Sequence, residues 1–202
     1  MQAPTPPYPA TLRIDYPAEL DRLTTFFRIL TVIPIAIVLG LLSRPGGDVR
    51  FGGVSVLFLP VLLLILFRLK YPRWWFDWNL ELARFSFRVA AYFALLRDEY
   101  PSTDEEQAVH VDLVYPGVQV GLNRWLPLVK WFLAIPHYIV LFFLGIGAVV
   151  VVIIAWFAIL FTGRYPRVLF DYIVGVMRWE LRVAAYAFIL ITDRYPPFSL
   201  GE

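Results

Sequence analysis

Residues 71–92 read YPRWWFDWNLELARFSFRVAAY, and residues 165–186 read YPRVLFDYIVGVMRWELRVAAY. Eleven of these 22 aligned positions are identical, at a constant offset of 94 residues. A second match, at an offset of 102 residues, aligns Leu20–Leu42 with Leu122–Leu144. Internal repetition on this scale determines the architecture of a chain. The sequence therefore predicts two copies of one structural unit.

The composition indicates a protein that resides in lipid. Of the 202 residues, 59% are hydrophobic, and the mean hydropathy is +0.66. A soluble protein of this size does not hide so much apolar surface in one core. The net charge is only +2 and no basic run is present, so nucleic acid is not an expected partner. The absence of cysteine excludes disulfides and thiol chemistry.

Long hydrophobic segments follow the start of each copy. In the first copy, Leu23–Ser43 and Phe51–Phe67 are separated by a Pro-Gly turn. In the second copy, Trp131–Gly163 contains no charged residue, and as one helix it would be about 50 Å long against a hydrocarbon core of about 30 Å. We expect this segment to fold back at Gly145–Gly147, with Lys130 snorkelling to the interface. Whether each hairpin spans the bilayer or re-enters on the same side stays open.

An amphipathic helix is predicted after each hairpin, over residues 72–97 and 166–192, and each begins at a proline. Charged residues recur along one face of each helix. Crossing a bilayer would cost about 2.5–3.5 kcal/mol for each of these side chains near its centre. We therefore expect both helices to lie in the membrane interface.

Short strands are predicted at residues 11–17 and 109–116, which alternate in polarity and end in Tyr-Pro. These strands could pair outside the membrane. The expected fold is an all-α membrane protein with four transmembrane helices, built as two parallel repeats of a helical hairpin and an interfacial helix. Its expected segments are a Pro-rich arm (1–10), the first repeat (11–101, hairpin about 23–67), an acidic linker (102–108) and the second repeat (109–202, hairpin about 125–163).

Basic residues predict the orientation. If the two copies are parallel, most of the basic residues that flank the hairpins share one face of the membrane, and the richer face is cytoplasmic. Both termini are then expected in the cytoplasm. The residues concerned are Arg22, Arg68, Lys70, Arg73, Arg124, Arg164 and Arg167.

Paired arginines on the amphipathic helices are the main candidates for a binding site. Guanidinium groups bind lipid phosphates in a bidentate manner. They also commonly snorkel, or pair with acidic neighbours to hold a helix in place. The candidates are Arg84, Arg88, Arg178 and Arg182.

Two further pairs of residues have expected structural roles. Arg73 and Arg167 each precede an aspartate by four residues, Asp77 and Asp171, so intrahelical ion pairs are expected. Pro34 and Pro136 occupy equivalent places in the first hydrophobic segment of each copy, where a proline is expected to kink a helix.

Catalytic and metal-binding patterns are not found in the sequence. The two histidines are His110 and His137, and His137 has no second ligand nearby, so neither a metal site nor a cofactor is expected. No hydrolase, phosphate-loop or zinc-protease motif is present. We expect a protein that is not an enzyme.

A set of motifs is spread along the second copy: Arg124, Lys130, Leu133–His137, Gly163–Arg167, Leu169–Asp171, Arg178–Trp179, Arg182–Tyr186 and Thr192–Phe198. With these motifs the second copy closely resembles a bacterial membrane family, domain of unknown function 4389. The first copy looks like a drifted version, in which Ile35 replaces the histidine and Lys70 replaces the arginine before Tyr-Pro. The resemblance implies a prokaryotic integral membrane protein, placed in the inner membrane, and it supplies no catalytic residues.

The expected function is that of a non-catalytic accessory or scaffold subunit, either in an assembly of membrane proteins or in a homo-oligomer. Small residues that allow close helix contacts, such as Gly147 and Gly175, are consistent with this role. The alternative is a lipid-binding or lipid-handling protein that uses the paired arginines.

Overall fold

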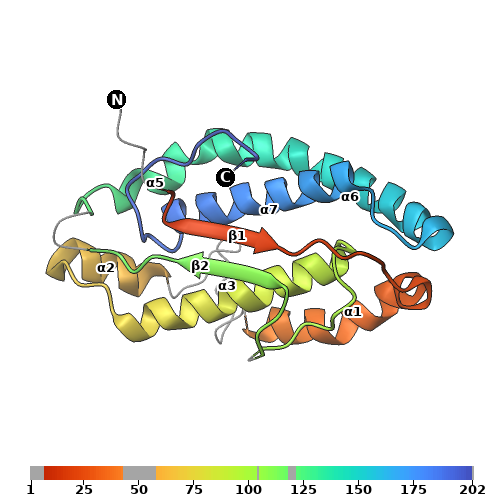
Figure 1. Cartoon of the computed structure of the whole chain (residues 1–202). Coiled ribbons are helices and arrows are strands. Elements are labelled where there is room, and N and C mark those ends of the chain that lie inside the picture. The colour runs from red at the N-terminus through yellow and green to blue at the C-terminus, as the bar shows by residue number, and fades with distance from the viewer. Residues whose placement is uncertain (1–6, 43–57, 104, 118–121, 202) are drawn as a thin grey trace.

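The computed structural model describes residues 7–42, 58–103, 105–117 and 122–201. These parts of the chain form six helices and one two-stranded sheet (Figure 1). The elements are β1 (Ala10–Ile14), α1 (Arg22–Leu42), α2 (Phe58–Arg68), α3 (Arg73–Phe93), β2 (Val109–Leu113), α5 (Pro127–Leu133), α6 (Ile135–Thr162) and α7 (Arg167–Ala187).

The two predicted strands are confirmed, and they pair antiparallel with Leu12 opposite Val111. Side chains alternate along β1, so that Leu12 is buried whereas Thr11 and Arg13 are exposed. One face of the sheet is covered by helices: α7 packs on β1 and α3 packs on β2. Each strand is therefore covered by a helix from the other half of the chain: β1 of the first half by α7, and β2 of the second half by α3.

The two predicted amphipathic helices are present as α3 and α7, and each begins directly after an extended proline, Pro72 or Pro166. Both end four or five residues before the predicted boundary. Shortly after each helix comes a leucine in the left-handed conformation, Leu95 with φ 64° and Leu190 with φ 62°. A left-handed residue reverses the chain and ends the helical hydrogen bonding, which the hydrophobic pattern did not indicate.

The environment of α7 differs from the expectation of a helix lying open on the membrane surface. Helix α7 lies between α6 and β1, and most of its residues are buried (Figure 1). Trp179, for example, is only 5% exposed. Its apolar side chains therefore pack against the protein itself, because the sheet and α6 cover both of its flanks.

The turn expected at Gly145–Gly147 is wrong, because α6 continues unbroken through this segment for 28 residues. Gly147 instead provides space for α7: a Cβ atom there would lie 2.5 Å from the hydroxyl of Tyr172. That hydroxyl donates a hydrogen bond of 3.0 Å to the carbonyl of Leu144. Packing against α7 thus supports a straight helix where glycine spacing predicted a turn.

The first predicted hairpin is seen only in part. Helix α1 fills most of the first predicted segment, Leu23–Ser43, and α2 begins at Phe58 within the second. The expected turn and the start of the second segment, Phe51–Leu57, lie outside the described residues.

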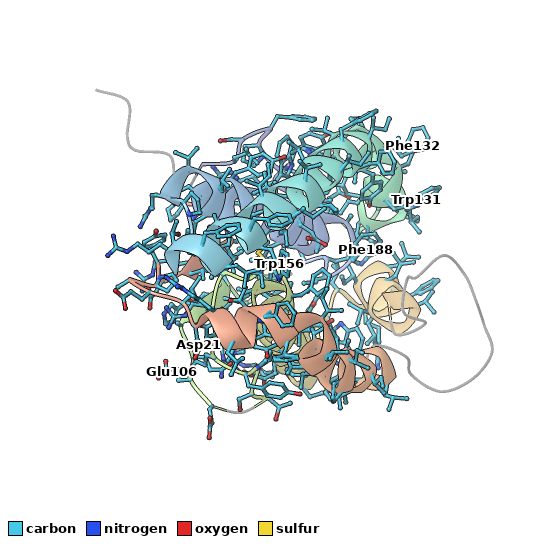
Figure 2. The ribbon with its side chains drawn as sticks, turned by 90° about the vertical axis from the view of Figure 1, so that its right-hand side faces the viewer. Asp21, Glu106, Trp131, Phe132, Trp156 and Phe188 are labelled. Carbon is cyan, nitrogen blue, oxygen red and sulfur yellow. The ribbon has the colours of Figure 1, made fainter. Side chains whose placement is uncertain are left out.

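Two helices in the described part of the chain, α1 and α6, are long and apolar enough to cross a membrane. In the most apolar stretch of α6, only 6% of the residues are buried inside the protein. Figure 2 shows mostly carbon on the side of Trp131 and Phe132, whereas nitrogen and oxygen gather on the side of Asp21 and Glu106. The protein therefore has an apolar layer, formed by α1, α2, α5 and α6, and a polar layer that contains the sheet.

Candidate functional site

At the centre of the two-stranded sheet, Leu12 of β1 lies opposite Val111 of β2. Antiparallel ladders alternate between hydrogen-bonded and non-hydrogen-bonded pairs. The amide of Asp15 donates to the carbonyl of Ala108 at 3.0 Å, three positions along the ladder from Leu12. Leu12 and Val111 are consequently a non-hydrogen-bonded pair, and their carbonyls point outward at the two edges of the sheet.

Two of the predicted arginines cap these edges. Arg84 in α3 donates from Nε to the carbonyl of Val111 at 3.1 Å. Arg178 in α7 donates from Nε to the carbonyl of Leu12, also at 3.1 Å. Exposed strand edges invite pairing with other chains, and a charged side chain over the edge prevents it. The arginine of each helix thus fixes and protects the strand that the helix covers.

The other two predicted arginines hold the segments that follow their helices. Arg88 is 7% exposed and donates to the carbonyl of Ser102 at 2.9 Å. Arg182 is 3% exposed and donates to the carbonyls of Ser199, at 3.2 Å, and Gly201. All four arginines therefore bind backbone carbonyls of this chain, a role that the sequence did not indicate; Arg84 in addition pairs with its acidic neighbour Glu81 at 2.7 Å. Their predicted contact with lipid phosphate stays a prediction.

A buried cation that the sequence reasoning did not select lies in α1. Arg28 is 2% exposed, and its guanidinium donates to the carbonyl of Arg97 at 2.6 Å and to the carboxylate of Asp98. It also lies 4.0 Å from the centre of the Tyr92 ring, a distance at which a cation is attracted to the ring face.

Lys130 in α5 occupies a matching environment. Its ammonium lies 2.6 Å from the carboxylate of Asp193, donates to the carbonyl of Thr192 at 2.7 Å, and lies 5.2 Å from the centre of the Tyr186 ring. The expectation that Lys130 snorkels is wrong, because the side chain is 0% exposed. A nearby carboxylate makes burial of the ammonium tolerable.

The two cation sites also have an equivalent backbone contact: in each, the carboxylate accepts a hydrogen bond from a backbone amide. Asp98 accepts a hydrogen bond from the amide of Asp21 at 2.7 Å, and Asp193 accepts one from the amide of Asn123. A signal for the sites exists in the sequence. The cations, Arg28 and Lys130, are separated by the same 102 residues as the second matching block.

Two tyrosines after the strands form a third matched set of contacts. Tyr16 follows β1, and its hydroxyl donates a hydrogen bond to the carbonyl of Tyr165. The guanidinium of Arg167 lies 4.6 Å from the centre of the Tyr16 ring. Tyr115 follows β2 and makes the corresponding contacts. It donates to the carbonyl of Tyr71 at 2.6 Å, and the guanidinium of Arg73 lies 4.9 Å from its ring centre.

Of the two predicted ion pairs, one forms. Arg167 and Asp171 lie 3.2 Å apart on the exposed face of α7. Arg73 and Asp77, both in the described part of the chain, do not pair. The guanidinium of Arg73 lies over Tyr115, but Arg167 lies over Tyr16 in the same way and still pairs with Asp171, so the ring contact does not account for the difference.

Buried tyrosine hydroxyls add neutral hydrogen bonds to this layer. Burial raises the pKa of Tyr71, with a smaller contribution from Tyr115, and its hydroxyl donates to the carbonyl of Ile189 at 2.6 Å. Burial also raises the pKa of Tyr8, although Arg182 and Arg194 oppose the shift. The Tyr8 hydroxyl donates to the carbonyl of Arg194 at 3.0 Å. These phenols therefore remain protonated donors over the ordinary pH range.

The two prolines have different surroundings. Pro34 lies inside α1, which continues past it as a helix. Pro136 lies in the first turn of α6, directly after the break at Ala134 that separates α6 from α5. Only the second proline therefore marks an interruption of helical structure.

His137 is fully buried at the start of α6, where Trp179 donates to its Nδ1 at 3.0 Å and the Phe198 ring stacks on it at 4.1 Å. These contacts fix the histidine against α7 and the C-terminal segment. His110 lies on β2, 3.2 Å from Asp15. No group of three or more acidic or histidine side chains that could hold a metal is present among the described residues.

Comparison with known proteins finds one partial match to a family. The domain of unknown function DUF4389 matches residues 125–199, which run from just before α5 into the C-terminal segment. The match covers the second half of the chain alone. No curated protein and no solved structure matches the chain.

Proposed function

We propose that the protein is a non-catalytic membrane protein that serves as an accessory or scaffold subunit of a membrane assembly, or forms a homo-oligomer. One observation supports the proposal: the four arginines considered as a lipid site bind this chain's own backbone. Arg88 and Arg182, for example, hold the segments after α3 and α7. Such contacts make a rigid body whose main exposed feature is its apolar layer.

Residence in a membrane is supported by the surface of α1 and α6. Both helices expose large apolar side chains along most of their length, such as Leu30 on α1 and Val149 on α6. Contiguous apolar surface of this extent marks a site of contact with lipid or with another protein. The bacterial inner membrane and cytoplasmic termini, expected from the sequence, are part of this proposal.

An origin from two tandem copies of the DUF4389 domain is also proposed. It is supported by the three sets of contacts that recur in the two halves: the arginine-capped strands, the buried cations and the tyrosines after the strands. In each set, equivalent residues make equivalent contacts, as do Arg28 with Asp98 and Lys130 with Asp193. Because each strand packs on a helix of the other half, each half of the chain stabilises the other.

A scaffold role is favoured over lipid handling by what the arginines contact. A lipid-handling site needs guanidiniums that are available to phosphate groups. Arg88 and Arg182 are both at least nine-tenths buried and directed at carbonyl oxygens. Lipid handling would require these segments to be displaced first.

The proposal is tested by extracting the full-length protein from its native membrane in a mild detergent and identifying what co-purifies. A scaffold subunit is expected to elute as a stoichiometric complex with another membrane protein or as a defined oligomer. Recovery only as a monomer, or a reproducible turnover by the purified protein, would contradict the proposal.

A further inference from the structure

We infer that α6 lies in the plane of the membrane, embedded in a single leaflet, so that the protein is held by one face and α6 does not cross the bilayer. This inference rests on the proposed membrane residence. It replaces the crossing hairpin that the sequence predicted for residues 125–163, because α6 is continuous.

The first argument comes from α7, which packs along α6 (Figure 1). Trp179 of α7 contacts His137 near the start of α6, and Tyr172 contacts Leu144 about two turns further on. If α6 crossed the bilayer, α7 would run beside it through the hydrocarbon. Its exposed carboxylates Asp171 and Glu180 would then face hydrocarbon, at a cost of about 2.5–3.5 kcal/mol for a charged side chain near the bilayer centre.

The second argument comes from the sheet. Arg178 binds the edge of β1, so the sheet would enter the membrane together with α7. The outer face of this sheet exposes polar side chains, Thr11, Arg13 and Asp112 among them. Open sheets do not occur in contact with lipid hydrocarbon, because their edge groups lack hydrogen-bond partners there.

The third argument comes from the ends of α6, which are both fixed to the polar layer. At its start, Leu133 in α5 accepts a hydrogen bond of 3.1 Å from Tyr195 in the C-terminal segment. At its end, the carbonyl of Gly163 accepts a hydrogen bond of 2.9 Å from Leu20, six residues after β1. Because contacts with the polar layer hold both ends of α6, we place the two ends on the same side of the membrane.

The acyl chains of one leaflet fit the exposed face of α6. An interface with another protein normally has a polar rim around its apolar centre, whereas α6 contains no Asp, Glu, Lys or Arg over its whole length. Trp125 and Trp131, both more than half exposed near one end of the face, are suited to the headgroup level. The exposed apolar residues of α6 run along its whole length and include Ile139, Phe143, Val149, Ile153, Phe157 and Phe161.

The inference is tested by measuring the depth of spin labels along α6 in the full-length protein. The chain has no cysteine, so the single variants Ile139→Cys, Val149→Cys and Phe157→Cys each carry one nitroxide. The labelled proteins are reconstituted in vesicles of phosphatidylcholine and phosphatidylglycerol, and depth is obtained from accessibility to oxygen and to a water-soluble nickel complex. Thr11→Cys and Asp112→Cys, on the open face of the sheet, serve as controls.

An in-plane helix predicts that all three labels lie at one similar depth, about 5–10 Å below the headgroup boundary. The two control labels are expected in water. A crossing or folded-back helix would instead place Val149 near the bilayer centre, about 15 Å deep, with Ile139 and Phe157 shallower, and would overturn the inference.

Two other outcomes would also overturn it, and they are distinguishable. Dipolar broadening at Val149 together with low accessibility to oxygen would mean that a second copy of the chain covers this face. Failure of the protein to float with vesicles would contradict membrane residence itself, and with it the proposed function.

Discussion

Leu12 and Val111 face each other at the centre of the sheet, and the outward carbonyl of each accepts a hydrogen bond from an arginine of the other half of the chain. The two halves are thereby interlocked rather than merely adjacent. Neither strand has its covering helix in its own half. The polar layer is complete only when both halves are present, which leads to the first prediction.

Cutting the chain between residues 103 and 104 is expected to leave two fragments that bind each other. Co-expressed fragments 1–103 and 104–202 should co-purify in detergent at equal stoichiometry, because the strands are exchanged between the halves. Leu12→Asp, which places a charge in the buried face of β1, should weaken the complex, whereas Thr11→Asp on the exposed face should not. Two folded fragments that purify separately would contradict the interlocked arrangement.

Breaking the buried cation site in α5 is expected to destabilise the protein strongly. Lys130→Met leaves Asp193 without its partner, and we expect a loss of about 3 kcal/mol in the free energy of unfolding, measured in detergent. The double variant Lys130→Met/Asp193→Asn should lose less than the sum of the single losses, since neither charge is then left alone.

The exposed pair Arg164 and Glu19 provides the control for this measurement. Its atoms are 4.0 Å apart and the side chains are 70% and 81% exposed. Glu19→Gln is therefore expected to change stability by less than about 1 kcal/mol. Equal effects at the buried and exposed pairs would show that burial of Lys130 does not matter.

Two glycines of the same helix should respond in opposite directions to alanine. Gly145→Ala meets nothing within 4 Å and should stabilise α6 by about 0.5–1 kcal/mol, through helix propensity alone. Gly147→Ala places a Cβ 2.5 Å from the Tyr172 hydroxyl and should destabilise the protein. Adding Tyr172→Phe should restore part of the loss. If both alanines were equally harmful, a turn at this segment would be favoured again.

Replacing the four arginines of α3 and α7 that bind backbone carbonyls is expected to affect stability and not lipid retention. Arg84→Gln, Arg88→Gln, Arg178→Gln and Arg182→Gln, made one at a time, should each cost about 1–3 kcal/mol because a charged hydrogen bond to a carbonyl is lost. Folded variants should retain phosphatidylglycerol as the unaltered protein does. A selective loss of this anionic lipid from the folded variants would favour the lipid-handling alternative.

The elements that depend on local pattern were predictable from the sequence. Proline followed by a helical apolar period predicted α3 and α7, and alternation ending in Tyr-Pro predicted β1 and β2. The ends of α3 and α7 were less predictable. The left-handed residues that follow them, Leu95 and Leu190, have no sequence signature of the kind that glycine supplies.

Features that depend on tertiary contacts were not predictable. Gly145–Gly147 read as a turn because nothing in the sequence indicates that Tyr172 packs on Gly147. The sequence left open whether the arginines bind lipid phosphate or hold the helices in place, because the strands that Arg84 and Arg178 cap lie far away in the chain. Burial of Lys130 depends on Asp193, which is 63 residues away and belongs to a segment without regular secondary structure.

The most direct test of the account is the side of the membrane on which the two ends of the apolar helix lie. Arg124→Cys and Arg164→Cys place single, exposed thiols before α5 and after α6. In intact cells and in inverted membrane vesicles, a membrane-impermeant maleimide should label both positions from the same side. Labelling of Arg124→Cys and Arg164→Cys from opposite sides would show that α6 crosses the bilayer and would contradict the account.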